Sequence, residues 1–331
     1  MKTKKVTTSI FALIQVVGMG CERKVVIPPD FTMSNKIVYV EDVDGKDGLY
    51  SADFGDIVAL DASTGVRMRL TYDDYFDRHP SYSRYDSAVI FESKRPVDES
   101  NAIDLSAPSH IFSFSLKTQN IQQMDQNWFT DGSGGQSFYP FACRARGGVI
   151  FGKKVDFCCQ VVSIYDYKTK SLRPISDTLD LIGGIRPSEN DSLVAYSFLS
   201  GGDILDRSST IEIRRTFDAG LVKEFHKKGW IYGLGDFKGR QLLFYTHEIK
   251  KGYSTELYSY DLDKDSTAKI HTFNNMHISD PVFSSTGIFY IGLVDTNDGY
   301  SADIYLLEAG TNEVKRVTND GHQKMNLFYC Y

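Results

Sequence analysis

A short apolar strand that contains an aromatic residue recurs six times along this chain of 331 residues. Successive aromatic positions are separated by 52, 60, 45, 49 and 45 residues. They are Tyr39, Phe91, Phe151, Tyr196, Tyr245 and Tyr290. A strand pattern repeated at this spacing is typical of an array in which each repeat folds as one small unit that packs on its neighbours.

Each repeat holds four short strands. After the aromatic strand come a second and a third strand, such as "DIYLLEA" and "VKRVT", and a further segment such as "HPSYSRYDS" precedes five of the six repeats. The strands read as continuous apolar runs, as expected where both faces of a sheet are buried. Four-stranded antiparallel units repeated radially form a propeller. The sequence therefore predicts an all-β fold, a six-bladed β-propeller of four-stranded antiparallel blades.

The two ends of the repeat array complement each other. The first repeat lacks its opening strand, and the chain end "KMNLFYCY" is a spare strand after the sixth repeat. We expect residues 325–331 to supply the innermost strand of the first blade, because this closure leaves no open sheet edge. The propeller is predicted to span residues 36–331.

The first 21 residues, "MKTKKVTTSIFALIQVVGMGC", have the pattern of an export signal: lysines, an apolar run from Val6 to Val17, and small residues before a cysteine. The run is too short for a stable membrane-spanning helix. The Gly20–Cys21 junction predicts a bacterial lipoprotein with lipid on Cys21, and a plain secretory signal is the alternative. Residues 22–35 are predicted to be a tether. We expect a lipid anchor to be the protein's only membrane attachment, in the outer membrane of the cell envelope.

Two blocks resemble the repeat of the TolB-type propellers. They are "RLTYDDYFDRHPSYSRYDSAVIFESKR" (69–95), with its threonine-ended strand and Pro-aromatic-Ser segment, and "ADIYLLEAGTNEVKRVTNDG" (302–321). The resemblance covers roughly residues 36–331, without the N-terminal domain of TolB itself. It implies a propeller of the bacterial envelope with a protein partner.

Several function classes are disfavoured by the residues. The net charge is −6 and no basic block is interleaved with aromatics, so no nucleic-acid partner is expected. Related propellers accompany serine peptidases, but no Gly-x-Ser-x-Gly motif occurs. The acidic segments 42–48 and 261–266 are predicted to be turns rather than calcium loops. We expect no cofactor and no metal, and the remaining cysteines, Cys143, Cys158, Cys159 and Cys330, are predicted to be buried or free thiols.

Function is expected on the face that carries the long connections 42–55, 94–109, 125–138 and 199–209, because loops on a rigid scaffold often carry binding sites. The candidate binding residues are Trp128, Trp230, His79, His226, His277, Asp280 and His322. The tryptophans are predicted to be exposed anchors for a partner. The histidines lie in connections between blades and either converge at the channel mouth or are ordinary polar loop residues.

These observations favour an envelope-anchored binding or scaffold propeller that presents its loop-rich face to a protein or glycan partner. The alternative is a metal-assisted polysaccharide lyase or hydrolase with its site at the channel mouth, as in the manganese-dependent oligogalacturonate lyases, which are built on a related propeller.

The Cys21→Ala substitution tests the predicted anchor. It removes the thiol that would carry the lipid, so the protein should move from the membrane fraction to the soluble fraction. Fractionation with immunodetection measures this. If the variant stays with the membranes and the unaltered protein carries no lipid, the anchor is wrong.

Overall fold

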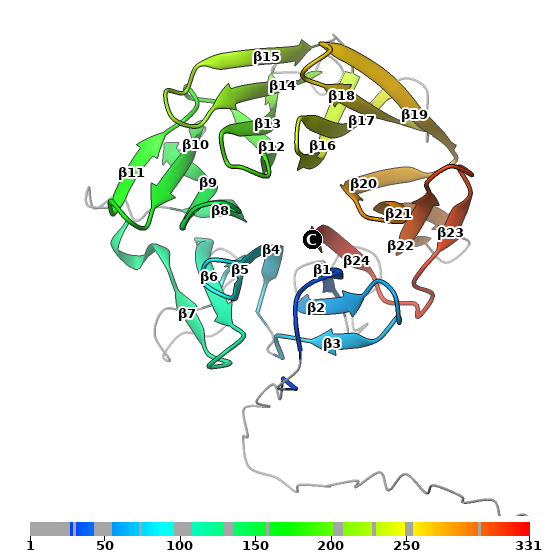
Figure 1. Ribbon diagram of the computed structural model, residues 1–331, viewed down its shortest axis with the longest axis horizontal. Helices are drawn as coiled ribbons and strands as arrows, with labels where there is room; N and C mark the ends of the chain where they lie inside the picture. The colour runs from blue at the N-terminus through cyan, green and yellow to red at the C-terminus, as the bar shows by residue number, and fades with distance from the viewer. Residues whose placement is uncertain are drawn as a thin grey trace, which may run out of the picture.

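A computed structural model shows a ring of six four-stranded antiparallel sheets around a central axis (Figure 1). It describes residues 27–28, 31–42, 55–72, 75–95, 108–128, 136–156, 159–200, 208–226, 230–248, 254–296 and 299–331. The predicted export signal and Cys21 lie outside this range, as do most residues of the long connections. None of the helical structure in the described ranges is long and apolar enough to cross a membrane.

Each blade has its first strand nearest the axis and its fourth at the rim. Blade 1 consists of β24 (Lys324–Cys330), β1 (Lys36–Glu41), β2 (Asp56–Asp61) and β3 (Arg67–Arg69), and blade 2 of β4 (Asp77–Ser83), β5 (Ala88–Ser93), β6 (His110–Ser115) and β7 (Ile121–Gln123). Blade 3 consists of β8 (Ser137–Ala142), β9 (Gly148–Asp156), β10 (Cys159–Asp166) and β11 (Ser171–Pro174), and blade 4 of β12 (Leu181–Pro187), β13 (Leu193–Ser200), β14 (Ser208–Arg215) and β15 (Leu221–His226). Blade 5 consists of β16 (Trp230–Lys238), β17 (Gln241–Glu248), β18 (Ser254–Asp261) and β19 (Ser266–Asn274), and blade 6 of β20 (His277–Phe283), β21 (Gly287–Thr296), β22 (Gly299–Glu308) and β23 (Val314–Arg316). A single 3-10 turn, η1 (Asp125–Asn127), follows β7. The predicted all-β, six-bladed propeller is confirmed.

The chain end closes the ring as predicted. Strand β24 pairs antiparallel with β1, with Val38 opposite Phe328 and Ile37 opposite Tyr329. Leu327, Phe328 and Tyr329 are buried. The innermost strand of the first blade thus comes from the far end of the sequence.

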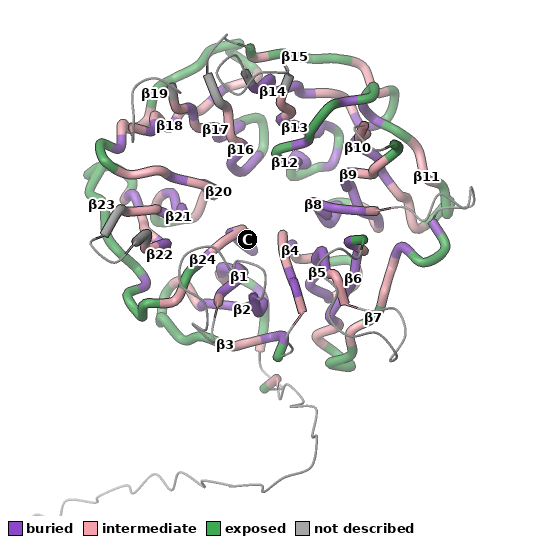
Figure 2. The backbone as a smooth tube through the Cα atoms, turned by 180° about the vertical axis from the view of Figure 1, so that it is seen from behind, coloured by how far each residue is buried: buried purple, intermediate pink, exposed green. Residues whose placement is uncertain are grey.

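The core lies between neighbouring blades, where both sheet faces are covered (Figure 2). Five of the six recurring aromatic residues are fully buried on the second strands, and the sixth, Tyr245, is partly buried. The cluster between blades 1 and 2 shows the pattern, because Val38 and Phe328 of blade 1 pack with Phe91 and Phe112 of blade 2. This explains the continuous apolar runs, since neither face of these strands meets water.

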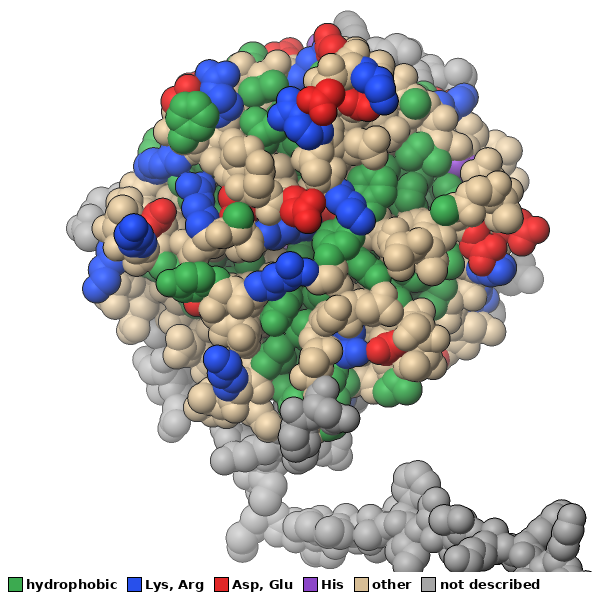
Figure 3. All heavy atoms as spheres, viewed as in Figure 1, with side chains coloured by type: hydrophobic (Ala, Val, Ile, Leu, Met, Phe, Trp, Pro, Cys, Tyr) green, Lys and Arg blue, Asp and Glu red, His purple; other side chains and the backbone are tan. Residues whose placement is uncertain are grey.

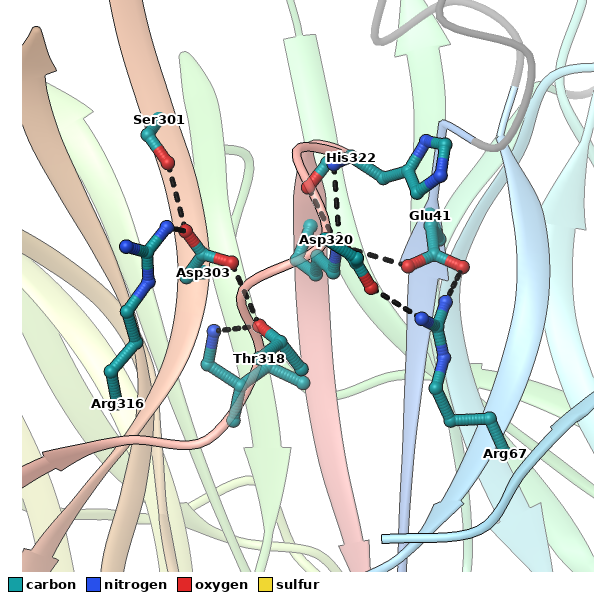
Figure 4. Close-up of polar contacts among 10 residues, drawn as sticks. Glu41, Arg67, Ser301, Asp303, Arg316, Thr318, Asp320 and His322 are labelled. Atoms are coloured by element: carbon teal, nitrogen blue, oxygen red, sulfur yellow. Dashed lines mark hydrogen bonds and ion pairs between the residues drawn. The ribbon is translucent and has the colours of Figure 1, made fainter.

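The threonine that follows the rim strand in each resembling block has a definite role. The Oγ1 atoms of Thr71 and Thr318 accept hydrogen bonds from the backbone N–H groups of Ile57 and Ile304, both at 2.9 Å. Thr318 also donates to Asp303, which pairs with Arg316 on the rim strand (Figure 4). These side chains fasten the rim strand to the third strand where the rim strand ends.

Part of the predicted tether packs on the ring. Met33 is 2% exposed and belongs to the cluster between blades 1 and 2. The N–H of Asn35 donates to the carbonyl of Cys330 at 2.9 Å. Residues 31–35 therefore form a packed lead into β1, while residues 22–26 lie outside the described part of the chain.

The acidic segment 261–266 is a hairpin turn, as predicted: Asp261 accepts hydrogen bonds from the N–H groups of Asp263 and Lys264 at 3.0 and 3.2 Å. The other acidic segment, 42–48, falls almost wholly outside the described residues. Cys143 and Cys330 are buried free thiols and Cys159 is a partly buried one, whereas Cys158 is not among the described residues.

The ring has two distinct faces. All six inner strands run in the same direction along the axis, so they begin at one face and end at the other. We call the face where they begin the mouth face; it carries the connections between blades and those between second and third strands. The opposite one, the hairpin face, carries the tight turns between first and second and between third and fourth strands.

Removing residues 325–331 should unfold the ring, because it exposes the edge of β1 and the apolar side chains that β24 covers. A milder form of the test is Phe328→Ala, which should lower the free energy of unfolding by about 3–5 kcal/mol. The matched control is Phe217→Ala, since Phe217 is 69% exposed on the hairpin face and should tolerate the change. Thermal and urea unfolding measure both, and an unchanged melting temperature after the deletion would contradict the closure.

Candidate functional site at the channel mouth

The inner strands carry irregularities at the same level around the axis. In each of the six, the inner strand has one extra residue where its register with the second strand shifts. His79, Tyr139, Asp280 and Asn326 occupy these bulges with φ of 49°, 50°, 48° and 52°. A left-handed conformation costs a non-glycine residue roughly 1–2 kcal/mol. Bulges redirect side chains, and here they set a ring of polar groups around the channel.

A histidine–carboxylate pair forms one side of this ring. His79 Nδ1 lies 2.9 Å from Glu92 Oε2, and the N–H of Tyr139 donates to the same oxygen at 3.1 Å. The rings of His79 and Tyr139 are 4.1 Å apart. Burial alone would raise the pKa of Glu92, but the hydrogen bond and charge of His79 hold it below its ordinary value. The carboxylate is therefore kept ionised and fully engaged.

An arginine–aspartate pair forms the other side. Arg186 of β12 binds Asp280 of β20 at 2.8 Å. The ion pair therefore links blades 4 and 6, which are separated in the ring by blade 5. The guanidinium of Arg186 also lies 4.7 Å from the ring of Phe141 in blade 3. Burial, with the charge of Glu92, raises the pKa of Tyr139 to about 12, so its hydroxyl stays protonated and can donate. The mouth thus combines paired charges with a phenol able to donate.

Side chains cross the axis at its hairpin-face end. Arg144, which follows β8, binds Asp236 of β16 at 2.9 Å, and the Tyr331 hydroxyl donates to the same carboxylate. Burial would lower the pKa of Arg144, but Asp236 raises it above its usual value. The guanidinium also packs 5.5 Å from the ring of Phe328. These contacts join blades 1, 3 and 5 behind the polar ring.

Of the predicted site residues, His79 and Asp280 lie together in the polar ring, at the bulges described above. His277, the first residue of β20, lies at the mouth face beside His247, with ring centroids 5.6 Å apart. Burial lowers the pKa of both histidines, and His277 lowers that of His247 further. Both imidazoles are therefore neutral at pH 7.

The other predicted histidines do not join this ring. His226 is the last residue of the rim strand β15 and bonds Thr210 at 3.0 Å. His322 lies between β23 and β24, where its N–H donates to Asp320 (Figure 4). The expected convergence of the histidines is thus not seen as a cluster: His79 lies on the inner strand of blade 2, and His277 begins that of blade 6 beside His247. Among the described residues, no group of three or more His, Cys, Asp or Glu is placed to hold a metal ion.

The two tryptophans differ from the expectation of exposed loop anchors. Trp128 is only 7% exposed, because its ring stacks on Tyr165 at 4.4 Å and packs against Phe151 between blades 2 and 3. Trp230 begins the inner strand β16, paired with Glu248, rather than lying in a loop. The exposed-anchor interpretation of Trp128 is wrong, and its side chain is part of the core.

Sequence reasoning missed Glu92, Tyr139, Arg186 and Leu181. Leu181, the first residue of β12, is 46% exposed at the mouth face. The sequence did contain a signal for Tyr139: like His79 and Asp280, it directly precedes a proline in an inner strand. Proline has no N–H to pair, which suits a bulge. No sequence pattern marks the contact between Arg186 and Asp280, 94 residues apart.

No family model matches the sequence, and no curated protein does. The structure is similar to TolB from Acinetobacter baumannii, with a TM-score of 0.63 and 11% identity over 89% of this chain and 66% of that chain. It is also similar to a chain of Kuenenia stuttgartiensis hydrazine synthase (TM-score 0.58, 10% identity, 90% of this chain and 46% of that chain). A chain of a nidogen/laminin complex gives a TM-score of 0.56 at 7% identity over 88% of this chain and 97% of that chain. At these identities the likeness concerns the fold, which is a TolB-like six-bladed β-propeller.

Trp128→Ala should destabilise the protein by about 3–5 kcal/mol, as truncation of a buried tryptophan does. The matched control is Tyr85→Ala, since Tyr85 is 69% exposed on the same pair of blades. Urea unfolding followed by circular dichroism compares them. Equal stability of the two variants would show that the packing of Trp128 contributes little.

Proposed function

We propose that this protein is an envelope-anchored binding propeller that holds a protein partner at the mouth of its channel. The observation that carries the proposal is the ring of bulged residues, in which His79, Tyr139 and Asp280 adopt a costly backbone conformation at one level of the axis. Such strain is often retained where it positions groups for recognition. The connections around this mouth are the ones that the sequence predicts to be functional.

The chemistry of the mouth supports recognition of a peptide segment. Its charges are already paired, as Arg186 with Asp280 and His79 with Glu92, so it needs no strongly charged ligand. Tyr139 keeps a protonated hydroxyl that can donate a hydrogen bond. Leu181, at the start of β12, adds an exposed apolar side chain at the mouth face. Apolar anchors next to hydrogen-bonding groups are typical of protein interfaces.

A lyase or hydrolase remains the second candidate because His79 and Glu92 form a dyad. A histidine 2.9 Å from a carboxylate and 16% exposed has the arrangement of a general base held in one orientation. Under this alternative, His79→Ala should abolish turnover of a polysaccharide substrate while binding persists.

The proposed function is tested by affinity purification from native membranes with identification of the proteins that co-purify. Leu181→Asp places a charge on the mouth and should weaken capture by about 2 kcal/mol or more, as expected for an interface anchor. The matched control is Leu221→Asp, because Leu221 is 49% exposed on the rim strand of the same blade and should leave capture unchanged.

Three results would count against the proposal. If Leu181→Asp captures the partner as well as the unaltered protein does, the mouth is not the binding surface. Loss of capture with Leu221→Asp alone would move the interface to the rim. Recovery of a polysaccharide and no protein would show that the partner is a glycan.

A further inference from the structure

The hairpin face over blades 2 and 3 carries a concentration of positive charge. Its four turns, residues 83–88, 115–121, 143–148 and 166–171, contain six basic and two acidic residues, although the whole chain has a net charge of −6. The basic residues are Arg84, Lys117, Arg144, Arg146, Lys168 and Lys170. Figure 3 shows Lys and Arg side chains distributed over this face, including the side of these two blades at the left. We call these four turns the basic patch.

The turns of the basic patch are held against one another. The N–H of Leu116 donates to the carbonyl of Ser87 at 3.0 Å, and that of Tyr167 to Gly147 at 3.3 Å. Tyr85 lies over Gly147, where a Cβ would come within 2.8 Å of its ring, and its ring centroid is 6.3 Å from that of Tyr167. The patch is therefore a single surface formed by two blades.

Its lysines differ from lysines elsewhere on the ring. Lys223, Lys269 and Lys315, on the rim strands of blades 4, 5 and 6, bind acidic partners at 2.6, 3.2 and 2.5 Å. Within the described ranges, the exposed Lys117, Lys168 and Lys170 have no ion pair with an acidic residue. The two acids of the patch are engaged locally, since Asp166 accepts the N–H of Thr169 at 2.9 Å and Asp86 accepts the Ser83 hydroxyl at 2.8 Å. Arg144 is an exception, because it binds Asp236 inside the ring. The charge that the patch offers to an external anion therefore comes mainly from its exposed lysines.

The N-terminal segment approaches β1 beside this patch. Strand β1 begins at the hairpin face, because it runs antiparallel to β24. Ile27 and Phe31, before it, pack on the same cluster as Leu116, the neighbour of Lys117. The described residues before β1 therefore lie at the hairpin face, close to the basic patch.

We infer that the basic patch rests on an anionic phospholipid bilayer, with Tyr85 at the headgroup level, as a second membrane contact beyond the lipid anchor that the sequence predicts to be the only one. Tyrosine suits this depth because it has an apolar ring and a polar tip, and lysines near an anionic surface are attracted to it. The 69% exposure of Tyr85, at the centre of the patch, is explained by such a surface. The mouth face then points away from the membrane, which leaves it accessible to a partner.

The experiment uses the full chain in vesicles of phosphatidylcholine alone or mixed with phosphatidylglycerol, each with acyl chains brominated near the headgroup. Tyr85→Trp places a fluorophore in the patch, and the signal of the unaltered protein is subtracted for Trp128 and Trp230. Bromine should quench the fluorescence at position 85 in the anionic vesicles and not in the neutral ones. Adding Lys117→Glu, Lys168→Glu and Lys170→Glu should abolish this quenching.

A matched control carries Lys223→Glu, Lys269→Glu and Lys315→Glu with Tyr85→Trp, which changes the net charge equally and should keep the quenching. Circular dichroism checks that both triple variants are folded. As a second test, high salt should reduce the quenching in the Tyr85→Trp protein that keeps its three patch lysines. Absence of quenching in anionic vesicles, or equal quenching in neutral ones, would overturn the inference. The inference goes beyond the proposed function and concerns the opposite face, so Leu181→Asp should leave this quenching intact whether or not a partner is captured at the mouth.

Discussion

The pairing of β24 with β1 is the interaction on which the rest of the structure depends. It joins the two ends of the sequence in one sheet and turns a row of blades into a ring. A cluster of charges lies at this seam: the fully buried Lys324 binds Glu41 at 3.0 Å, and Arg67 and Asp320 complete the group (Figure 4). Two positive and two negative charges balance each other there, which is what the burial of a lysine requires.

Ring closure also determines the geometry of the mouth. The contacts that link the bulges cross blade boundaries, so they depend on the closed ring. Asn326 of blade 1 accepts a hydrogen bond from the N–H of His79 in blade 2 at 3.3 Å, and Arg186 of blade 4 reaches Asp280 of blade 6. An open ring would leave Arg186 buried without its carboxylate, so the polar ring and the closure stabilise each other.

The two faces of the ring are suited to different partners. At the mouth face, acidic and basic groups are paired and an apolar side chain is exposed, whereas the hairpin face of blades 2 and 3 presents unpaired lysines around an exposed tyrosine. Because the N-terminal segment joins at the hairpin face, one polypeptide can be held at one face and bind at the other. This division follows from the direction of the inner strands alone.

The fold could be predicted from the sequence because a propeller repeats one local pattern. Buried aromatic positions such as Tyr39 and Tyr290, and the spare strand after the sixth repeat, are visible in sequence order. The site could be predicted only in part. His79 was noticed as a histidine near a blade connection, although it lies on the inner strand β4. Glu92 and Arg186 carry no such sequence signal, because their partners, His79 and Asp280, are set by the closed ring. Trp128 was misplaced because a residue that follows a rim strand can fold back between blades, as the stacking on Tyr165 shows.

The most direct test of the account is photo-cross-linking in intact cells with a photoreactive phenylalanine at position 181 or 217. Leu181 lies at the mouth face and Phe217, in the turn between β14 and β15, at the hairpin face, and both are well exposed. The account predicts a cross-linked protein partner from position 181 and none from position 217. A protein adduct from position 217, with none from position 181, would contradict it.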